Sequence, residues 1–268
     1  MIANARMYSV NPATSAAWHT LLEWVIARAG VACEVIDYPA PLPLPALWAR
    51  PDLGCAFMCG FPFSLATPSL ALLAAPVPSA PPFGGEPVYW TDFVVRADSH
   101  FQRLEDTFGH RLAYTTEGSQ SGYQAPRRLL APHARARGGR LFAATVGPLQ
   151  TPRRIVDAVL DGQADVGPLD SYAHELLRLT EPGLAAQLRV VGVTAPTTMP
   201  PLVAAPGIAP AEVARLREAL CATAQASGLA EVCATLGLRR FVPMAAERYQ
   251  RLQDEAREAD ALGYRYLA

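Results

Sequence analysis

Predicted strands alternate with predicted helices along most of the chain, and this alternation constrains its fold more than any other feature. In the first part, a helix over residues 13–29 separates two short strands, and a proline- and glycine-rich loop over residues 76–87 precedes a long strand. The strands predicted here are residues 7–9, 33–37, 55–59 and 89–96. This order indicates an α/β fold with mostly parallel sheets.

A second series of the same kind follows residue 96. Its predicted strands are residues 111–115, 141–145, 164–170 and 188–193, and its predicted helices are residues 101–108, 122–130, 152–161 and 172–179. Helices are expected last, over residues 210–225, 229–236 and 245–260. We therefore expect lobe 1 to begin with residues 1–92, lobe 2 to span residues 93–190, and residues 191–268 to return to lobe 1. Ligands bind at the carboxyl ends of strands in such sheets.

Composition excludes several classes of function. The 268 residues are 51% apolar and 18% charged, which is typical of a folded globular protein. A net charge of -1 offers no field for nucleic acid or for an anionic membrane. All 23 basic residues are arginine, so P-loop and Schiff-base lysines are ruled out.

The cysteines and histidines do not form a recognisable metal or disulfide pattern. There are five cysteines and no C-x-x-C pair, and Cys55 and Cys59 lie in an apolar run that predicts a buried strand. The five histidines are scattered without H-E-x-x-H spacing, and we expect them to be exposed to solvent. No metal site and no cofactor is predicted.

The N-terminus lacks the basic and apolar segments of a signal peptide, and no apolar stretch reaches the ~18 residues of a membrane span. The expected location is the periplasm if a leader was removed, and the cytoplasm otherwise.

The segment from Tyr114 to Pro126 carries the clearest chemical signal. A strand ends there, small hydroxyl residues turn the chain, and a helix begins. The free N–H groups and positive dipole of a helix start, with two serine hydroxyls beside them, suit an oxyanion. Serine also commonly caps helices, so Ser119 or Ser121 fits that role as well.

Four segments resemble, in order, motifs of the phosphate and phosphonate substrate-binding proteins of ABC transporters. The sequence Glu117-Gly118-Ser119-Gln120-Ser121-Gly122-Tyr123 resembles the family's ligand loop. The others are Val94–Ser99, the pair Gly162–Val166 and Leu169–Ser171, and Gly237–Pro243. The resemblance spans most of the chain. It implies the two-lobed type II periplasmic-binding-protein fold, which closes on a small oxyanion in a cleft between the lobes.

The resemblance also implies roles for individual residues. Ser119, Gln120 and Ser121 would supply hydroxyl, amide and backbone donors at the helix start, which includes Gly122. Asp170 would stand opposite them and accept a hydrogen bond from a protonated oxygen or an amine of the ligand. A cap on the helix over residues 172–179 is the alternative role of Asp170.

Lobe 1 is expected to contribute residues that line the ligand. These are Tyr8, Gly60 and Phe61, together with Tyr89 in the crossing segment 89–91. For the aromatic residues, packing in the core is the alternative.

One segment departs from the family pattern. Members often carry Gly-Ser-His or Gly-Ala-His where this chain has Leu149-Gln150-Thr151-Pro152. The missing histidine allows an oxyanion other than phosphonate, or a partly organic ligand, with Gln150 and Thr151 as neutral donors.

The chain is therefore expected to bind a small anionic ligand for an ABC importer, with its permease as protein partner and with no catalytic residue. Two other functions stay open. One is an enzyme on a related fold, a lyase or an enzyme of pyrimidine-precursor synthesis, with Asp170 and Ser121 in acid/base roles. The other is a cytoplasmic ligand sensor. Residues 118–122 do not fit the G-x-S-x-G spacing of a nucleophile elbow.

Overall fold

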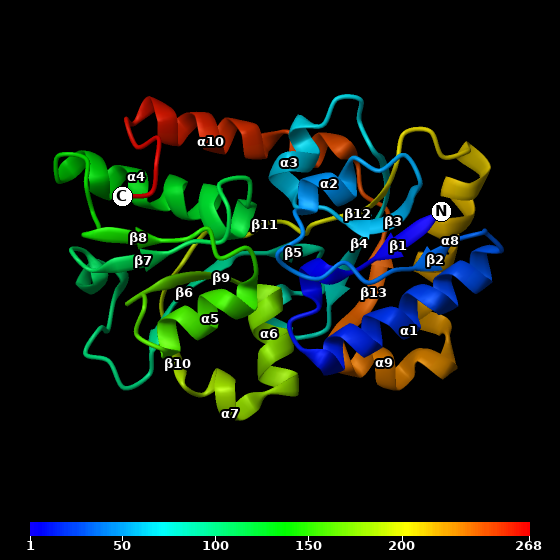
Figure 1. Ribbon diagram of the computed structural model, residues 1–268, viewed down its shortest axis with the longest axis horizontal. Coiled ribbons are helices and arrows are strands. Elements are labelled where there is room, and N and C mark those ends of the chain that lie inside the picture. The colour runs from blue at the N-terminus through cyan, green and yellow to red at the C-terminus, as the bar shows by residue number, and fades with distance from the viewer. The chain divides into compact units, whose positions relative to one another are not determined.

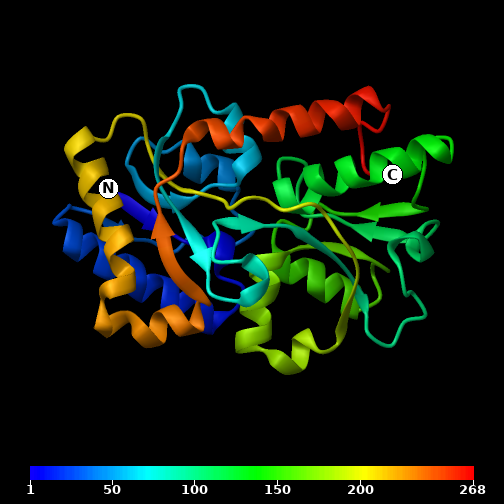
Figure 2. The same ribbon diagram turned by 180° about the vertical axis from the view of Figure 1, so that it is seen from behind.

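The computed structural model describes residues 1–268, and the chain forms two compact units (Figures 1 and 2). Unit 1 comprises Met1–Val88 and Thr198–Arg248, and unit 2 comprises Tyr89–Thr197 and Tyr249–Ala268. The chain thus passes between the units three times. At the first two passages β5 (Val88–Tyr89) pairs with β11 (Thr197–Thr198).

Unit 1 is built on a six-stranded sheet with the strand order β13-β4-β12-β3-β1-β2. The strands are β1 (Ile2–Asn4), β2 (Glu34–Val35), β3 (Leu53–Phe57), β4 (Ala71–Pro78), β12 (Leu202–Ala204) and β13 (Leu238–Val242). The helices are α1 (Pro12–Ala29), α2 (Leu44–Trp48), α3 (Gly60–Leu65), α8 (Pro210–Ala222) and α9 (Ala230–Thr235). β1 is parallel to β2 and β3, as a βαβ order requires, whereas β12 and β13 pair antiparallel with their neighbours.

β4 is a strand that the sequence pattern conceals, because Pro76 and Pro78 predict a loop from residue 76 onwards. β12 pairs with residues 71–74 of β4, and β13 pairs with residues 75–78. The second half of β4, which contains Pro76 and Pro78, therefore pairs with β13 only. Proline is tolerated in such an edge position, where its missing N–H costs no ladder hydrogen bond.

The first strand lies earlier than predicted. β1 ends at Asn4, and residues 6–8 form a short 3₁₀ turn instead of a strand. The side-chain oxygen of Asn4 accepts a hydrogen bond from the Arg6 N–H at 2.9 Å, which turns the chain directly after β1. α1 then begins with a capping box formed by Asn11 and Thr14, close to its predicted start.

Unit 2 contains an antiparallel sheet, β10-β6-β9, and a parallel pair, β7 and β8. A parallel bridge between Leu112 and Val166 joins β7 to the chain that enters β9. The strands are β6 (Thr91–Arg96), β7 (Arg111–Ala113), β8 (Ala144–Val146), β9 (Gly167–Asp170) and β10 (Leu188–Val193). The helices are α4 (Ala125–Ala136), α5 (Pro152–Leu160), α6 (Ser171–Thr180), α7 (Pro182–Ala185) and α10 (Arg251–Ala261).

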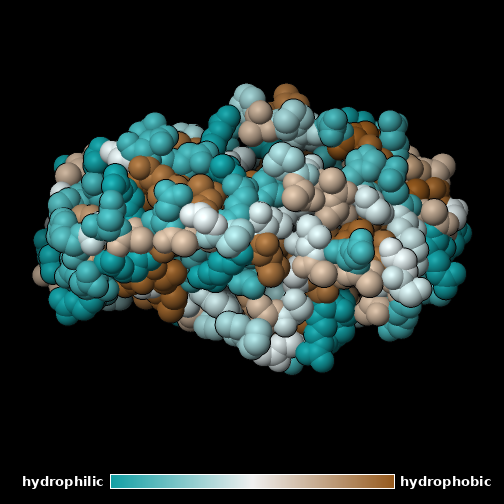
Figure 3. All heavy atoms as spheres, turned by 90° about the horizontal axis from the view of Figure 1, so that it is seen from below, coloured by the Kyte–Doolittle hydropathy of each residue, from teal (hydrophilic) through white to brown (hydrophobic).

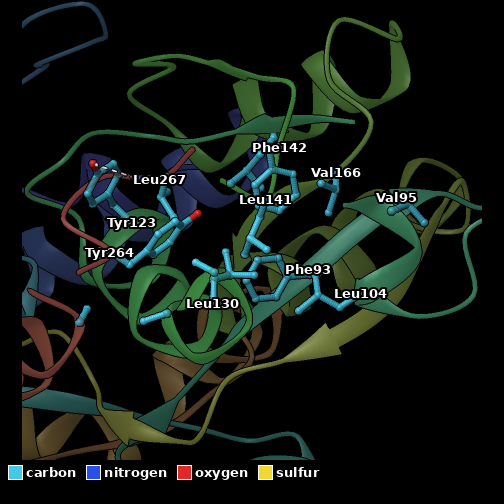
Figure 4. Close-up of a cluster of buried hydrophobic side chains, with 14 of the residues drawn as sticks. Phe93, Val95, Leu104, Tyr123, Leu130, Leu141, Phe142, Val166, Tyr264 and Leu267 are labelled. Carbon is cyan, nitrogen blue, oxygen red and sulfur yellow. Dashed lines mark hydrogen bonds between the residues drawn. The ribbon is translucent and has the colours of Figure 1, made fainter. Parts of the chain in front are cut away.

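The core of unit 2 includes the C-terminal segment 249–268 (Figure 4). Tyr264 and Leu267 lie in one buried cluster with Phe93, Leu130 and Phe142. α10 packs against α4. The prediction that residues 191–268 return as a whole to lobe 1 is therefore corrected for residues 249–268, because their apolar side chains are buried in unit 2.

On the face shown in Figure 3, hydrophobic residues are interspersed with hydrophilic ones. No helix of the chain is both long enough and apolar enough to cross a membrane.

We predict that Leu267→Ala destabilises unit 2 by about 2 kcal/mol or more, because Leu267 is only 5% exposed within the core cluster. Its neighbour Tyr266, which is 68% exposed, supplies the control: Tyr266→Ala should change stability by no more than about 0.5 kcal/mol. Urea unfolding followed by far-UV circular dichroism measures both. Equal effects of the two changes would contradict the packing of the C-terminal segment.

The thiols are expected to react slowly in the folded protein. Burial raises the pKa of Cys33 to about 11 and also raises the pKa of Cys55, Cys221 and Cys233. A raised pKa keeps each thiol protonated at neutral pH, and the thiolate is the reactive form. Titration with a disulfide reagent at pH 7.5 should therefore be slow in the native state and fast after denaturation. Rapid stoichiometric labelling of native Cys33 at pH 7.5 would be the contrary result.

Candidate functional site

The strands β7, β8 and β9 of unit 2 run in the same direction, and each is followed by a helix. β7 and β8 are parallel, and the bridge between Leu112 and Val166 gives the chain entering β9 the same direction. Their carboxyl ends therefore meet at one edge, from which the chain continues into α4, α5 and α6. In α/β proteins this edge is where ligands bind.

The helix after β7 begins with a π-helical turn, Gln120–Gln124, that continues into α4. Ser119 caps this turn, because its Oγ accepts a hydrogen bond from the Gly122 N–H at 2.9 Å. In general, the first N–H groups of a helix have no acceptor within the helix and point away from its N-terminus. This helix start can therefore donate backbone hydrogen bonds to an anion.

Gly122 permits a close contact that no other residue could make. A Cβ at this position would lie 1.9 Å from the Thr115 Oγ1 and 3.0 Å from the Ser119 Oγ. Thr115 is 8% exposed, and its hydroxyl has no hydrogen-bond partner. The sequence pattern placed Thr115 at the end of the predicted strand 111–115 but gave no sign that it would contact Gly122, because the shape of the turn between the two residues is not encoded in the periodicity.

Asp170 and Ser121 are brought together. One carboxylate oxygen of Asp170 accepts hydrogen bonds from the N–H groups of Tyr172 at 2.9 Å and Ala173 at 3.0 Å, so Asp170 caps α6. The other oxygen accepts from the Ser121 Oγ at 3.3 Å. The capping role is thus present, and the same side chain places a carboxylate beside the start of the helix at Gln120.

The start of β6 lies beside this group. Thr91 pairs with Asp170 in the sheet, its Oγ1 donates to the Ser121 carbonyl at 2.8 Å, and its N–H donates to the Thr194 Oγ1 at 2.9 Å. Both Thr91 and Thr194 are buried. Thr91 belongs to the predicted crossing segment 89–91, whereas no sequence signal pointed to Thr194.

Asp92, the residue after Thr91, belongs to a buried cluster of hydrogen-bonded side chains. The His174 Nδ1 lies 2.7 Å from one carboxylate oxygen of Asp92, and the Trp90 indole N–H donates to the other at 2.8 Å. Asp92 and His174 are 3% and 2% exposed, so the prediction that every histidine is exposed is wrong for His174. Arg178 lies 3.9 Å from Asp92 and compensates its charge. The contact between His174 and Asp92 links α6 to β6.

The Gln120 side chain faces the C-terminal segment. Its amide nitrogen donates to a carboxylate oxygen of Glu255 at 3.4 Å, and Arg251 bonds the other oxygen at 3.1 Å. Arg127, about two turns further along the helix, donates to Gln124 Oε1 and to the Ala256 carbonyl, each at 2.9 Å. These contacts hold α10 against the helix that starts at Gln120.

The loop after β8 packs against the turn before this helix. The Gln150 N–H donates to the Thr115 carbonyl at 2.9 Å, and the Leu149 N–H donates to the Tyr114 carbonyl at 3.0 Å. Gln150 has a φ of 70°, which is uncommon for a residue other than glycine. Thr151 caps α5 through the Arg154 N–H at 3.2 Å.

The other predicted site residues are distributed over both units. Tyr8, Gly60 and Phe61 belong to unit 1. The Tyr8 ring is 1% exposed and packs edge-on against Phe57 at 5.0 Å, as the alternative of core packing foresaw. Tyr89, which is also 1% exposed, is the first residue of unit 2.

The arrangement offers neutral donors around one helix start and a single carboxylate beside it. No group of three or more His, Cys, Asp or Glu side chains is placed to hold a metal ion. Burial raises the pKa of the nearby Tyr123, so its hydroxyl stays neutral at physiological pH.

We predict that Gly122→Ala destabilises the protein by about 1–3 kcal/mol and weakens anion binding, because the added Cβ would overlap the Thr115 Oγ1. Gly118→Ala is the matched control in the same turn, since a Cβ there meets no atom within 4 Å. Thermal unfolding of both variants measures the effect. A Gly122→Ala protein as stable as the Gly118→Ala protein would show that the contact with Thr115 is loose.

Comparison with known proteins gives a consistent result. The family described as the periplasmic substrate-binding protein of phosphonate ABC transporters matches residues 47–249. No curated protein sequence matches the chain.

Solved structures share the fold at low sequence identity. A binding protein component of an ABC phosphonate transporter from Pseudomonas aeruginosa is 19% identical, with a TM-score of 0.76 over 98% of this chain and 94% of that chain. PhnD1 from Prochlorococcus marinus, in complex with methylphosphonate, is 16% identical, with a TM-score of 0.76 over 97% and 98% of the two chains. The aliphatic sulphonate binding protein SsuA from Escherichia coli is 18% identical, with a TM-score of 0.56 over 99% and 88%. The predicted two-lobed type II periplasmic-binding fold is confirmed.

Proposed function

Since the chain belongs to the family of periplasmic phosphonate-binding proteins of ABC transporters, as its motifs predicted, we propose that it binds a phosphonate-, phosphate- or sulfonate-like anion and delivers it to an ABC importer. The observation that carries this proposal is the helix start at Ser119–Gly122, where backbone N–H groups and hydroxyls converge without a metal ion. Charge-assisted hydrogen bonds to an oxyanion contribute about 1.5–3 kcal/mol each, so a few of them support useful affinity.

Asp170 limits what the anion can be. A carboxylate oxygen already accepts the Ser121 hydroxyl at 3.3 Å, so a bare anionic oxygen beside it would be repelled. A protonated oxygen, as in a hydrogen phosphonate or a hydrogen phosphate, could donate to Asp170, and so could an ammonium group on the organic part of a ligand. This favours phosphorus oxyanions and zwitterions over fully ionised sulfate.

A binding role is proposed over an enzymatic one. The Ser119 and Ser121 hydroxyls bond Gly122 and Asp170, and neither bonds a histidine that could activate it as a nucleophile. His174, four residues after Asp170, places its Nδ1 2.7 Å from a carboxylate oxygen of Asp92. Transport implies the periplasm as location and an importer permease as partner.

A thermal-shift screen tests this function. The panel contains methylphosphonate, inorganic phosphate, methanesulfonate and sulfate. A ligand at a hundredfold excess over its Kd stabilises the folded state by about 2.7 kcal/mol, which gives a clear rise in melting temperature. We expect at least one phosphorus oxyanion to produce it, and the double change Ser119→Ala and Ser121→Ala to abolish it.

The control carries Ser15→Ala and Ser227→Ala, two exposed serines of unit 1. It should keep the full ligand shift. If no anion stabilises the wild-type protein, the oxyanion function is refuted. If the Ser119 and Ser121 variant keeps the shift, the anion binds elsewhere.

A further inference from the structure

Four hydroxyl groups lie around the start of the helix at Gln120, and they differ in their hydrogen-bond partners. Thr91 donates to the Ser121 carbonyl at 2.8 Å, and Ser121 donates to Asp170 at 3.3 Å. Ser119 accepts from the Gly122 N–H. The Thr115 hydroxyl has no hydrogen-bond partner, although its Oγ1 is covered by protein.

The position of Thr115 shows where its hydroxyl is directed. The oxygen lies against the α-carbon side of Gly122, since a Cβ there would be 1.9 Å away, and the Ser119 Oγ is 3.0 Å from the same point. Both hydroxyls therefore lie on the same side of the first turn, next to Gly122. The Thr115 carbonyl accepts the Gln150 N–H at 2.9 Å, which holds the residue between the helix start and the loop after β8.

A buried hydroxyl without a partner lowers stability, because the group loses its water and gains nothing in return. Valine has nearly the shape of threonine and would avoid this loss. An orphan hydroxyl that faces a helix start, within a proposed anion site, is explained if the ligand supplies the missing acceptor.

We propose that Thr115 is a ligand-contacting residue, whose hydroxyl donates a hydrogen bond to an oxygen of the bound oxyanion on the same side as Ser119. This assignment rests on the proposed function and also orients the ligand. The charged oxygens face Thr115 and Ser119, where no carboxylate bonds either hydroxyl, and the protonated oxygen or the ammonium group faces Asp170.

The test is an isosteric series measured by isothermal titration with methylphosphonate and with inorganic phosphate. Thr115→Val should weaken binding about tenfold to a hundredfold, as expected for the loss of one hydrogen bond to a charged group. Its ligand-free melting temperature should equal or exceed that of the wild type, because the orphan hydroxyl is gone. Thr115→Ser, which keeps the hydroxyl, should bind within about threefold of the wild type.

Thr107→Val is the matched control. Thr107 is fully buried in the same unit, but its hydroxyl donates to the Leu104 carbonyl at 2.6 Å. This variant should therefore lose stability and keep the wild-type Kd, the reverse of Thr115→Val.

Two results would overturn the assignment while leaving the proposed function intact. One is wild-type affinity in the Thr115→Val protein for both probes. The other is a fall in its ligand-free melting temperature as large as that of Thr107→Val, which would show a structural hydrogen bond. If the wild-type protein binds neither probe nor any other anion of the panel, the proposed function itself fails, and the Thr115 assignment fails with it.

Discussion

The helix that follows β7 starts at Gln120, and the first N–H groups of a helix have no acceptor carbonyl within it. The proposed site in unit 2 depends on this property of helix N-termini. The Ser119 hydroxyl oxygen accepts a hydrogen bond from one of these N–H groups, the Gly122 N–H, at 2.9 Å. The absence of a side chain at Gly122 lets Thr115 approach the same turn. Sequence and packing thus concentrate donors at one point and supply few acceptors there, which is the condition for anion binding.

Few charged side chains contribute directly to the proposed site. The arginines nearest in sequence, Arg127 and Arg128, form ion pairs with Asp260 and Glu258 of the C-terminal segment. The donors that remain at the helix start are neutral, and the charged group beside them is the Asp170 carboxylate. A site of this kind selects its ligand by hydrogen-bond direction and protonation more than by net attraction.

The C-terminal segment gives the site its support. It leaves unit 1 at Arg248 and enters the core of unit 2 through Tyr264 and Leu267. The Gln120 side-chain amide donates to Glu255 at 3.4 Å and so links the helix that starts at Gln120 to α10. The Gln120 backbone N–H stays at the helix start in its predicted place.

The sequence by itself determined the α/β class, the family, and the helix start at Ser119–Gly122, because periodicity, caps and turn residues are local signals. It also located Asp170 at the end of its strand. Tertiary structure alone decided that β4 tolerates two prolines, that residues 249–268 join unit 2, that His174 is buried against Asp92, and that Thr115 lies under Gly122. Each of these depends on which segments become neighbours in space, and pairing between residues far apart in the chain leaves no periodic trace in either segment.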